Sequence, residues 1–196
     1  MTRNFKQRAT RNLQAALAPN RRFPHNPFQG RWLRFYFFNP DLLFEPQFVM
    51  KAKALRNGEN SVCVCMSDLD FAPLEDDAIQ NEIFLDEAMS GEDYMATLRG
   101  TSAADGWLYR MDRYGWASDV GQWCIYCERN NEIAVLALRG DVVARDFVPV
   151  LQQFGALPIG QAIKEPRSYG LSSRGLPDEW RDIMLQEYGV KENGDP

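Results

Sequence analysis

Histidine is nearly missing from this chain of 196 residues, which contains only His25. Serine–histidine–aspartate and cysteine–histidine arrangements would therefore need His25 itself as their base. Metal sites that use several histidines, such as H-E-x-x-H, cannot be built. His25 also lies in a proline-rich stretch, which is a poor platform for catalysis. We predict that it is an exposed or hydrogen-bonded surface residue.

Long apolar runs and nucleotide-binding motifs are missing as well. No run approaches the roughly 20 apolar residues that a membrane-spanning helix needs. The first residues lack the apolar core of a secretory signal. The patterns G-x-G-x-x-G, G-x-x-x-x-G-K-[ST] and G-x-S-x-G do not occur. We therefore expect a cytoplasmic protein that uses no membrane and no cofactor, and these absences argue against most kinds of enzyme.

Charge of one sign is missing from two long segments. Residues 1–40 contain eight Lys or Arg and no acid, whereas residues 57–98 contain eleven Asp or Glu and no Lys or Arg. The net charge of -5 conceals this division. Such asymmetry indicates either charged partners or the way in which parts of one chain meet.

The four cysteines occur as Cys63-x-Cys65 and Cys124-x-x-Cys127, a pattern that could supply a four-thiolate zinc site. Both pairs, however, lie in segments that have the pattern of β-strands. Residues three apart on a strand point to opposite faces, so Cys124 and Cys127 should diverge. We predict free, buried cysteines and no metal site.

Hydrophobic periodicity predicts an α+β fold with a mostly antiparallel sheet of about four to six strands and helices packed on it. The pattern favours helices over residues 6–18, 46–56, 75–89, 145–154 and 177–188, and strands over residues 31–38, 61–66, 107–113, 122–128 and 132–138.

The last two strands give the clearest signal, a hairpin joined by the polar residues 129–131. Its second arm is apolar on both faces, so we expect a central strand with helices on at least one side. Between residues 106 and 138 no room remains for crossover helices, which argues against a parallel sheet. We divide the chain into a basic N-terminal helix and arm (1–30), a single α+β domain (31–190) and a frayed tail (191–196).

The hairpin Trp123–Ala137, with the preceding Tyr114–Asp119, resembles bacterial immunity proteins that neutralise toxins of contact-dependent or type VI secretion systems. In several such families an aromatic-led strand ends in an acid and a turn, and then continues into an E-I-A-hydrophobic strand. The resemblance is limited to residues 114–138 and transfers no binding residue. It implies a small cytoplasmic protein without an active site, which blocks the catalytic cleft of a cognate toxin domain.

A nuclease toxin would present a basic cleft, because it must attract phosphates. An acidic helix can imitate the nucleic-acid backbone there and accelerate encounter by electrostatic steering. We therefore predict that the acidic stretch binds the partner, with Tyr94 as an aromatic anchor. The candidate residues are Asp76, Asp77, Glu82, Asp86, Glu87, Glu92, Asp93 and Tyr94.

Two alternatives stay open. The basic arm could follow phosphates and stack on bases, with Arg3, Lys6, Arg8, Arg11, Arg21 and Arg22 interleaved by Phe5, Phe23 and Phe28. The acids in the middle of the chain argue against nucleic acid, and the arm could instead fold over the acidic region 68–93. In the second alternative, a pair among Asp68, Asp70, Glu75, Asp76 and Asp77 performs acid–base or Mg²⁺ chemistry. Nothing in the sequence holds that pair in place, and a solvated acidic face is the simpler interpretation.

Overall fold

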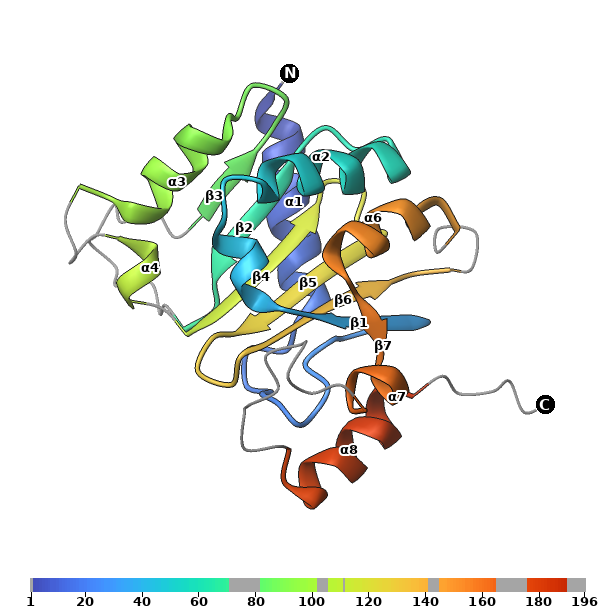
Figure 1. Ribbon diagram of the computed structural model, residues 1–196. Helices are drawn as coiled ribbons and strands as arrows, with labels where there is room; N and C mark the ends of the chain where they lie inside the picture. Colours follow the sequence, from blue (N-terminus) through green and yellow to red (C-terminus); the bar gives the residue numbers. More distant parts are fainter. Residues whose placement is uncertain are drawn as a thin grey trace.

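The computed structural model describes residues 2–70, 82–101, 106–110, 112–140, 145–164 and 176–189. A seven-stranded sheet in the order β3-β2-β4-β5-β6-β1-β7 forms its centre, and helices cover both faces (Figure 1). All strand pairs are antiparallel. The predicted α+β class is confirmed, and the sheet is slightly larger than expected.

The strands are β1 (Arg34–Phe38), β2 (Val64–Asp68), β3 (Glu82–Leu85), β4 (Arg113–Ser118), β5 (Trp123–Glu128), β6 (Ile133–Leu138) and β7 (Leu157–Pro158). The helices are α1 (Thr2–Ala16), η1 (Pro40–Phe44, a 3-10 helix), α2 (Phe48–Glu59), α3 (Gly91–Arg99), α4 (Trp107–Arg110), α6 (Val148–Phe154), α7 (Ile159–Ala162) and α8 (Asp178–Tyr188).

The predicted hairpin is confirmed as β5 and β6, which pair from Trp123 opposite Leu138 to Glu128 opposite Ile133. Every residue of both strands is buried. The reason is that alternate side chains enter two different cores, one on each face of the sheet. Strand β6 lies between β5 and β1, so it is the central, covered strand that its composition predicts.

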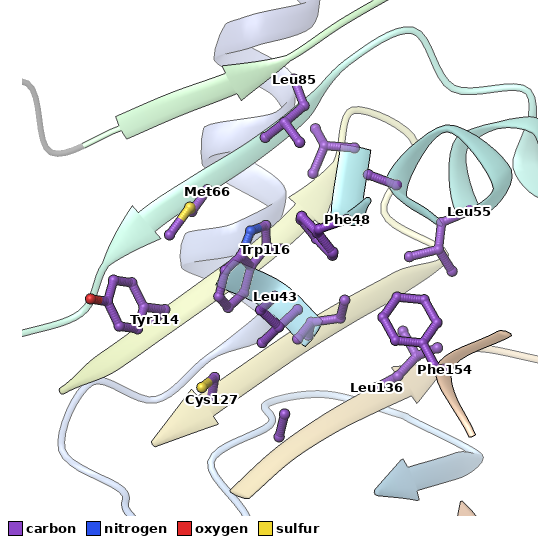
Figure 2. Close-up of a cluster of buried hydrophobic side chains, with 14 of the residues drawn as sticks. Leu43, Phe48, Leu55, Met66, Leu85, Tyr114, Trp116, Cys127, Leu136 and Phe154 are labelled. Atoms are coloured by element: carbon purple, nitrogen blue, oxygen red, sulfur yellow. The ribbon is translucent and has the colours of Figure 1, made fainter. Parts of the chain in front are cut away.

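The first core lies between the sheet and the layer formed by η1, α2, α3, α4 and α6. Figure 2 shows part of this core, with Phe48 and Leu55 of α2 above Trp116 of β4. Phe48 of α2 packs edge-on against Trp116 of β4, with ring centroids 5.9 Å apart. Phe154 of α6 packs in the same way on Phe38 of β1 at 4.8 Å. Removal of each large apolar side chain from water stabilises the fold by about 1.5–3 kcal/mol.

The second core lies on the opposite face, under α1, the arm that follows it, α7 and α8. Ala9, Leu13 and Ala16 form the apolar stripe that α1 turns toward the sheet. The helix approaches closely because β4 has a glycine beneath it. A Cβ atom on Gly115 would lie 2.7 Å from Leu17 Cδ1 and 2.8 Å from Leu13 Cδ1. The described part of the N-terminal segment, residues 2–30, therefore shares this core with the sheet, and the predicted tail 191–196 lies outside the described residues.

The helix predicted over residues 75–89 is wrong where the structure describes it, because Glu82–Leu85 forms β3. The spacing of Ile79 and Ile83 suggests a helix, but a period of two accounts for residues 82–85. Ile83 and Leu85 enter the first core, and Phe84 packs against the second. Pairing with β2, in which Met66 lies opposite Ile83, decides between the two periods.

The strand predicted over residues 107–113 is also wrong, since Trp107–Arg110 forms α4 and β4 begins at Arg113. Trp107 is buried in the first core and stacks on Tyr114, with ring centroids 6.4 Å apart. The Tyr114 hydroxyl donates to the Trp107 carbonyl oxygen at 2.6 Å. These tertiary contacts fix a helical turn in a segment whose local alternation favours a strand.

Candidate functional site

The acidic side chains predicted to bind a partner differ in their surroundings. Asp76 and Asp77 lie outside the described residues. Glu82 on β3 is only partly exposed, and its Oε2 accepts a hydrogen bond from the Thr10 hydroxyl of α1 at 3.0 Å. Glu82 therefore links α1 to the edge strand of the sheet, and its carboxylate is held by a hydrogen bond within the chain.

Glu87 is an exposed acid that pairs with two cations of the same chain. Its side chain is 78% exposed and lies 3.3 Å from Lys53 Nζ and 3.4 Å from Arg56 Nη2, both on α2. Arg56 is buried, and its Nε and Nη1 have no hydrogen-bond partner among the described residues. Glu87 is thus the counter-ion of a buried guanidinium, which holds an exposed carboxylate in one position.

Three further acids lie near Glu87 in the sequence, of which Asp86 is partly exposed and the other two are exposed. Asp86 follows β3, and its Oδ1 accepts the Ala88 N–H at 3.0 Å. Glu92 and Asp93 are exposed in the first turn of α3, where the helix dipole favours negative charge. The Ser90 hydroxyl oxygen caps this helix by accepting the Asp93 N–H at 3.1 Å. We call Asp86, Glu87, Glu92 and Asp93 the acidic rim.

Tyr94 is not part of this surface, so its prediction as an aromatic anchor is wrong. It is fully buried, and its hydroxyl donates to the Leu43 carbonyl oxygen at 2.7 Å. Its ring packs against Phe48 with centroids 5.7 Å apart. Burial raises the pKa of the Tyr94 hydroxyl well above its ordinary value. The helical period places Tyr94 on the inner face of α3 while Glu92 and Asp93 point outward.

The basic N-terminal segment meets acids of its own chain. Arg8 forms an ion pair with Asp119, and Arg22 lies 2.9 Å from Asp70 Oδ1 and 3.4 Å from Asp112 Oδ2. Two of the phenylalanines proposed to stack on bases, Phe23 and Phe28, are buried in the second core. The predicted folding over the acidic region 68–93 is matched by the contact of Arg22 with Asp70, whereas Asp112 and Asp119 lie outside that region.

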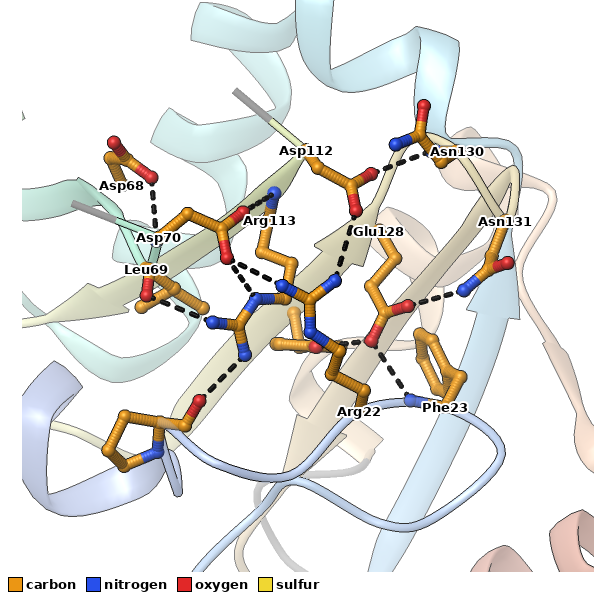
Figure 3. A network of polar contacts seen from close by, with 12 residues as sticks. Arg22, Phe23, Asp68, Leu69, Asp70, Asp112, Arg113, Glu128, Asn130 and Asn131 are labelled. Atoms are coloured by element: carbon orange, nitrogen blue, oxygen red, sulfur yellow. Dashed lines mark hydrogen bonds and ion pairs between the residues drawn. The ribbon is translucent and has the colours of Figure 1, made fainter. Parts of the chain in front are cut away.

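A polar network that the sequence analysis missed fastens the arm to the sheet (Figure 3). Arg113 of β4 is buried, and its Nε donates to Asp70 Oδ1 at 2.6 Å. Its Nη1 donates to the Pro19 carbonyl oxygen at 2.7 Å, and its Nη2 donates to the Leu69 carbonyl oxygen at 3.2 Å. The only signal in the sequence is the pair of acids Asp68-x-Asp70, which does not indicate a partner so far along the chain.

Glu128 is the second carboxylate of this network and is 1% exposed. It accepts hydrogen bonds from the Phe23 backbone N–H, the Tyr126 hydroxyl and the Asn131 side-chain amide. Burial raises the pKa of the Tyr126 hydroxyl, and the adjacent Glu128 charge adds to this effect. Both oxygens of Glu128 are thus engaged within the chain, which is the arrangement of a structural acid.

The described acids that were considered for catalysis are held by other groups of the chain and do not form an open pair. Glu75, Asp76 and Asp77 lie outside the described residues. The side chain of Asp70 is bound by Arg22 and Arg113, and Asp68 Oδ1 accepts the Asp70 N–H at 2.8 Å. His25 has a side chain that is 60% exposed and lies 2.9 Å from Glu187 Oε1, as predicted for a surface residue with a hydrogen bond.

The four cysteines are buried and free, as predicted. Cys65 and Cys124 belong to the second core and Cys127 to the first, so Cys124 and Cys127 diverge to opposite faces. Burial, followed by the nearby Asp119 charge, raises the pKa of the Cys63 thiol to about 11. No cluster of three or more possible metal ligands occurs in the described part of the chain.

No protein-family model, curated protein or solved structure matches this chain. None of the described helices has the length and apolar character needed to cross a membrane.

Proposed function

We propose that this chain is a cytoplasmic immunity protein, which binds a toxin domain through the acidic rim and blocks it without catalysing a reaction. The support is the grouping of Asp86, Glu87, Glu92 and Asp93 within one short, ordered stretch of the surface. The resemblance of residues 114–138 to immunity proteins points to the same function.

Electrostatics favours a basic partner for the rim. No Lys or Arg occurs between residues 57 and 98, and the two cations that approach Glu87 come from α2 beneath it. Their guanidinium and ammonium groups offset part of the Glu87 charge, so Asp86, Glu92 and Asp93 carry most of the negative field. Exposed charges of one sign accelerate encounter with an oppositely charged cleft. The cleft of a nuclease toxin has this character.

The observation that carries the proposal is the exposure of Glu87, Glu92 and Asp93, with Asp86 partly exposed next to Glu87, in contrast to the other acids of the same segment. Asp68 is buried, Asp70 is bound by two arginines, and Glu82 is bonded to α1. These three act within the chain. Glu87 and Asp93 also have partners in the chain, Lys53 and Arg56 for Glu87 and the Ser90 hydroxyl for Asp93, but their side chains remain exposed to another molecule.

The test is a binding measurement with the toxin domain that copurifies with the protein from its source strain. We expect the Glu92→Lys, Asp93→Lys double variant to bind at least about tenfold more weakly, mainly through slower association, and the deficit to shrink as salt is raised. The Glu179→Lys, Asp182→Lys variant is the matched control, because it makes the same charge change on an exposed face of α8.

Equal weakening by both variants would show that only net charge matters and would contradict the rim as the interface. Unchanged affinity in the rim variant would contradict it as well. Restored growth of toxin-expressing cells is the functional readout, and the rim variant should protect them less than the control variant.

A further inference from the structure

A second surface lies between α1 and β3, two elements that are far apart in the sequence. It is a groove of about 510 Å³, open to solvent. One wall is the exposed side of α1, and the other is formed by alternate residues of β3. The lining residues are Lys6, Gln7, Thr10, Arg11, Glu82 and Phe84.

The two cations of this groove differ from the other arginines of the N-terminal segment. Arg8 and Arg22 are paired with acids of the chain, but no described acid lies within ion-pair distance of Lys6 or Arg11. Lys6 Nζ lies 5.0 Å from the centroid of the Phe84 ring, and Arg11 Nε donates to the Gln7 carbonyl oxygen of its own helix at 3.3 Å. Both side chains are therefore ordered along the groove and retain their charge for a ligand.

The floor of the groove belongs to an edge strand. In the described sheet, β3 pairs with β2 on one side only, and no described strand pairs with its other side. An extended segment that adds to such an edge forms backbone hydrogen bonds and places every second side chain on the same face. On the α1 face those side chains would meet Lys6 and Arg11.

We propose that the groove between α1 and β3 binds an extended segment of a partner protein, which adds to β3 and directs carboxylate side chains toward Lys6 and Arg11. This surface is separate from the acidic rim and goes beyond the immunity function, because it recognises the opposite charge. The two cations against the single acid Glu82, which is bonded to Thr10, give the groove a net positive charge.

A peptide fits the groove better than a nucleic acid does. The cation of Lys6 already lies over the Phe84 ring, so that ring offers no free face on which a base could stack. The β3 edge, by contrast, has the spacing and polarity that a peptide backbone needs.

Titration of the full-length, ¹⁵N-labelled protein with synthetic peptides tests the proposal. The probe is a ten-residue peptide of alternating Thr and Asp, compared with its Thr–Lys counterpart, with the same peptide N-methylated at alternate residues, and with a ten-nucleotide oligothymidine. We expect the Thr–Asp peptide to shift the amide signals of Glu82–Leu85 and of Lys6–Arg11. The Thr–Lys and N-methylated peptides should leave these signals unshifted.

Charge variants then show which side chains bind. Lys6→Glu and Arg11→Glu should each weaken the Thr–Asp peptide at least about tenfold, the change expected when one charge-assisted contact becomes repulsive. Arg31→Glu is the matched control, because Arg31 is exposed outside the groove, and this variant should bind as the original protein does. Lys6→Gln removes the positive charge but retains a polar side chain, so we expect an intermediate loss of peptide affinity. An amide spectrum that matches that of the original protein in the absence of peptide, apart from signals next to residue 6, would show that the variant is folded.

Several results would overturn the proposal. They are an absence of shifts in β3, equal binding of the N-methylated peptide, equal weakening by Arg31→Glu, and stronger shifts of the same residues by the oligonucleotide. None of these results bears on the acidic rim, whose variants change other residues and are tested with a different partner.

Discussion

The basic N-terminal segment and the acidic rim are blocks of opposite charge that the protein uses in different ways. In the N-terminal segment, Arg8 and Arg22 pair with acids of the same chain and hold the arm against the sheet. In the rim, Glu92 and Asp93 point into solvent from the first turn of α3. A run of like charge in a sequence can therefore form ion pairs within the fold or remain exposed for binding another molecule. The position of the counter-charges distinguishes the two uses.

The largest expected effect comes from breaking the buried part of the arm network. Arg113→Met leaves the carbonyl oxygens of Pro19 and Leu69 without their donor and removes the buried guanidinium that pairs with Asp70, so we expect a loss of about 3–5 kcal/mol in the free energy of unfolding. Arg22→Met removes an exposed partner of the same carboxylate and should cost less than about 1 kcal/mol. Urea unfolding of both variants measures the difference, and equal losses would contradict a buried anchor.

The packing of α1 on the sheet can be tested at Gly115. Gly115→Ala places a methyl group against Leu13 and Leu17, so we expect a loss of about 1–3 kcal/mol from overpacking. Gly160→Ala in α7 is the control, because a Cβ there meets nothing within 4 Å. It should change stability by less than about 1 kcal/mol and can raise it. Thermal unfolding compares the two, and an unaffected Gly115→Ala protein would mean that α1 does not lie tightly on β4.

The rim should contribute little to stability, in contrast to the arm. The Glu92→Lys, Asp93→Lys double variant loses two favourable interactions with the helix dipole and the hydrogen bond from the Ser90 hydroxyl to Asp93, so we expect a cost of about 1–2 kcal/mol. Its partner affinity should nevertheless fall as described above. Circular dichroism melting provides the measurement, and a loss as large as that of Arg113→Met would assign the rim a structural role.

The smallest effect concerns the contact between the arm and α8. Burial alone would raise the pKa of Glu187, but hydrogen bonds from His25 and the Asn26 N–H, with the nearby charges of His25 and Arg21, lower it below its ordinary value of 4.5. The stabilisation is therefore complete above pH 4.5 and is lost as the pH falls through the lowered folded-state pKa. For this partly exposed group it should not exceed about 1 kcal/mol.

The measurement is the difference in unfolding free energy between the original protein and Glu187→Gln across pH 3–7, flanking the ordinary value of 4.5. This difference should be largest at the upper end and shrink toward acid pH. His25→Gln should reduce the pH dependence, since it removes one of the groups that lower the pKa of Glu187. A difference that grows toward acid pH would have the wrong sign for this contact.

The best sequence predictions concern segments whose local pattern and tertiary environment agree. The hairpin of β5 and β6 has aromatic and β-branched residues, a polar turn and alternation that matches its two cores. Cys124 and Cys127 follow the strand period and diverge as expected. The amphipathic stripe of α1 is likewise visible in Leu13 and Ala16. Each of these features depends on neighbours within a few residues, so the sequence carries the whole signal.

The wrong predictions arise where a distant strand or core overrides the local pattern. Glu82–Leu85 becomes a strand because β2 offers an edge to pair with, and no residue nearby in the sequence indicates this. Tyr94 is of a residue type that often anchors interfaces, but its side chain packs beside Phe48 in the first core and is buried there. Residues 107–110 have the alternating pattern of a strand but fold into α4. In the helix, the Trp107 side chain is buried in the first core and stacks on Tyr114, and this packing outweighs the local preference.

The same distinction between local pattern and tertiary contacts applies to the two candidate surfaces. Residue type and short-range order in the sequence were enough to predict opposed blocks of charge, one surface histidine, free cysteines and an antiparallel α+β architecture, because these features depend on neighbours within a few residues. Only the tertiary structure decided which charges are free. Arg113 pairs with Asp70 and Arg8 pairs with Asp119, whereas Lys6 and Arg11 border a groove in which no described acid lies within ion-pair distance of them. Charge pairing acts over a few ångströms in space, whatever the separation along the chain, so chain folding decides which charges remain for a partner.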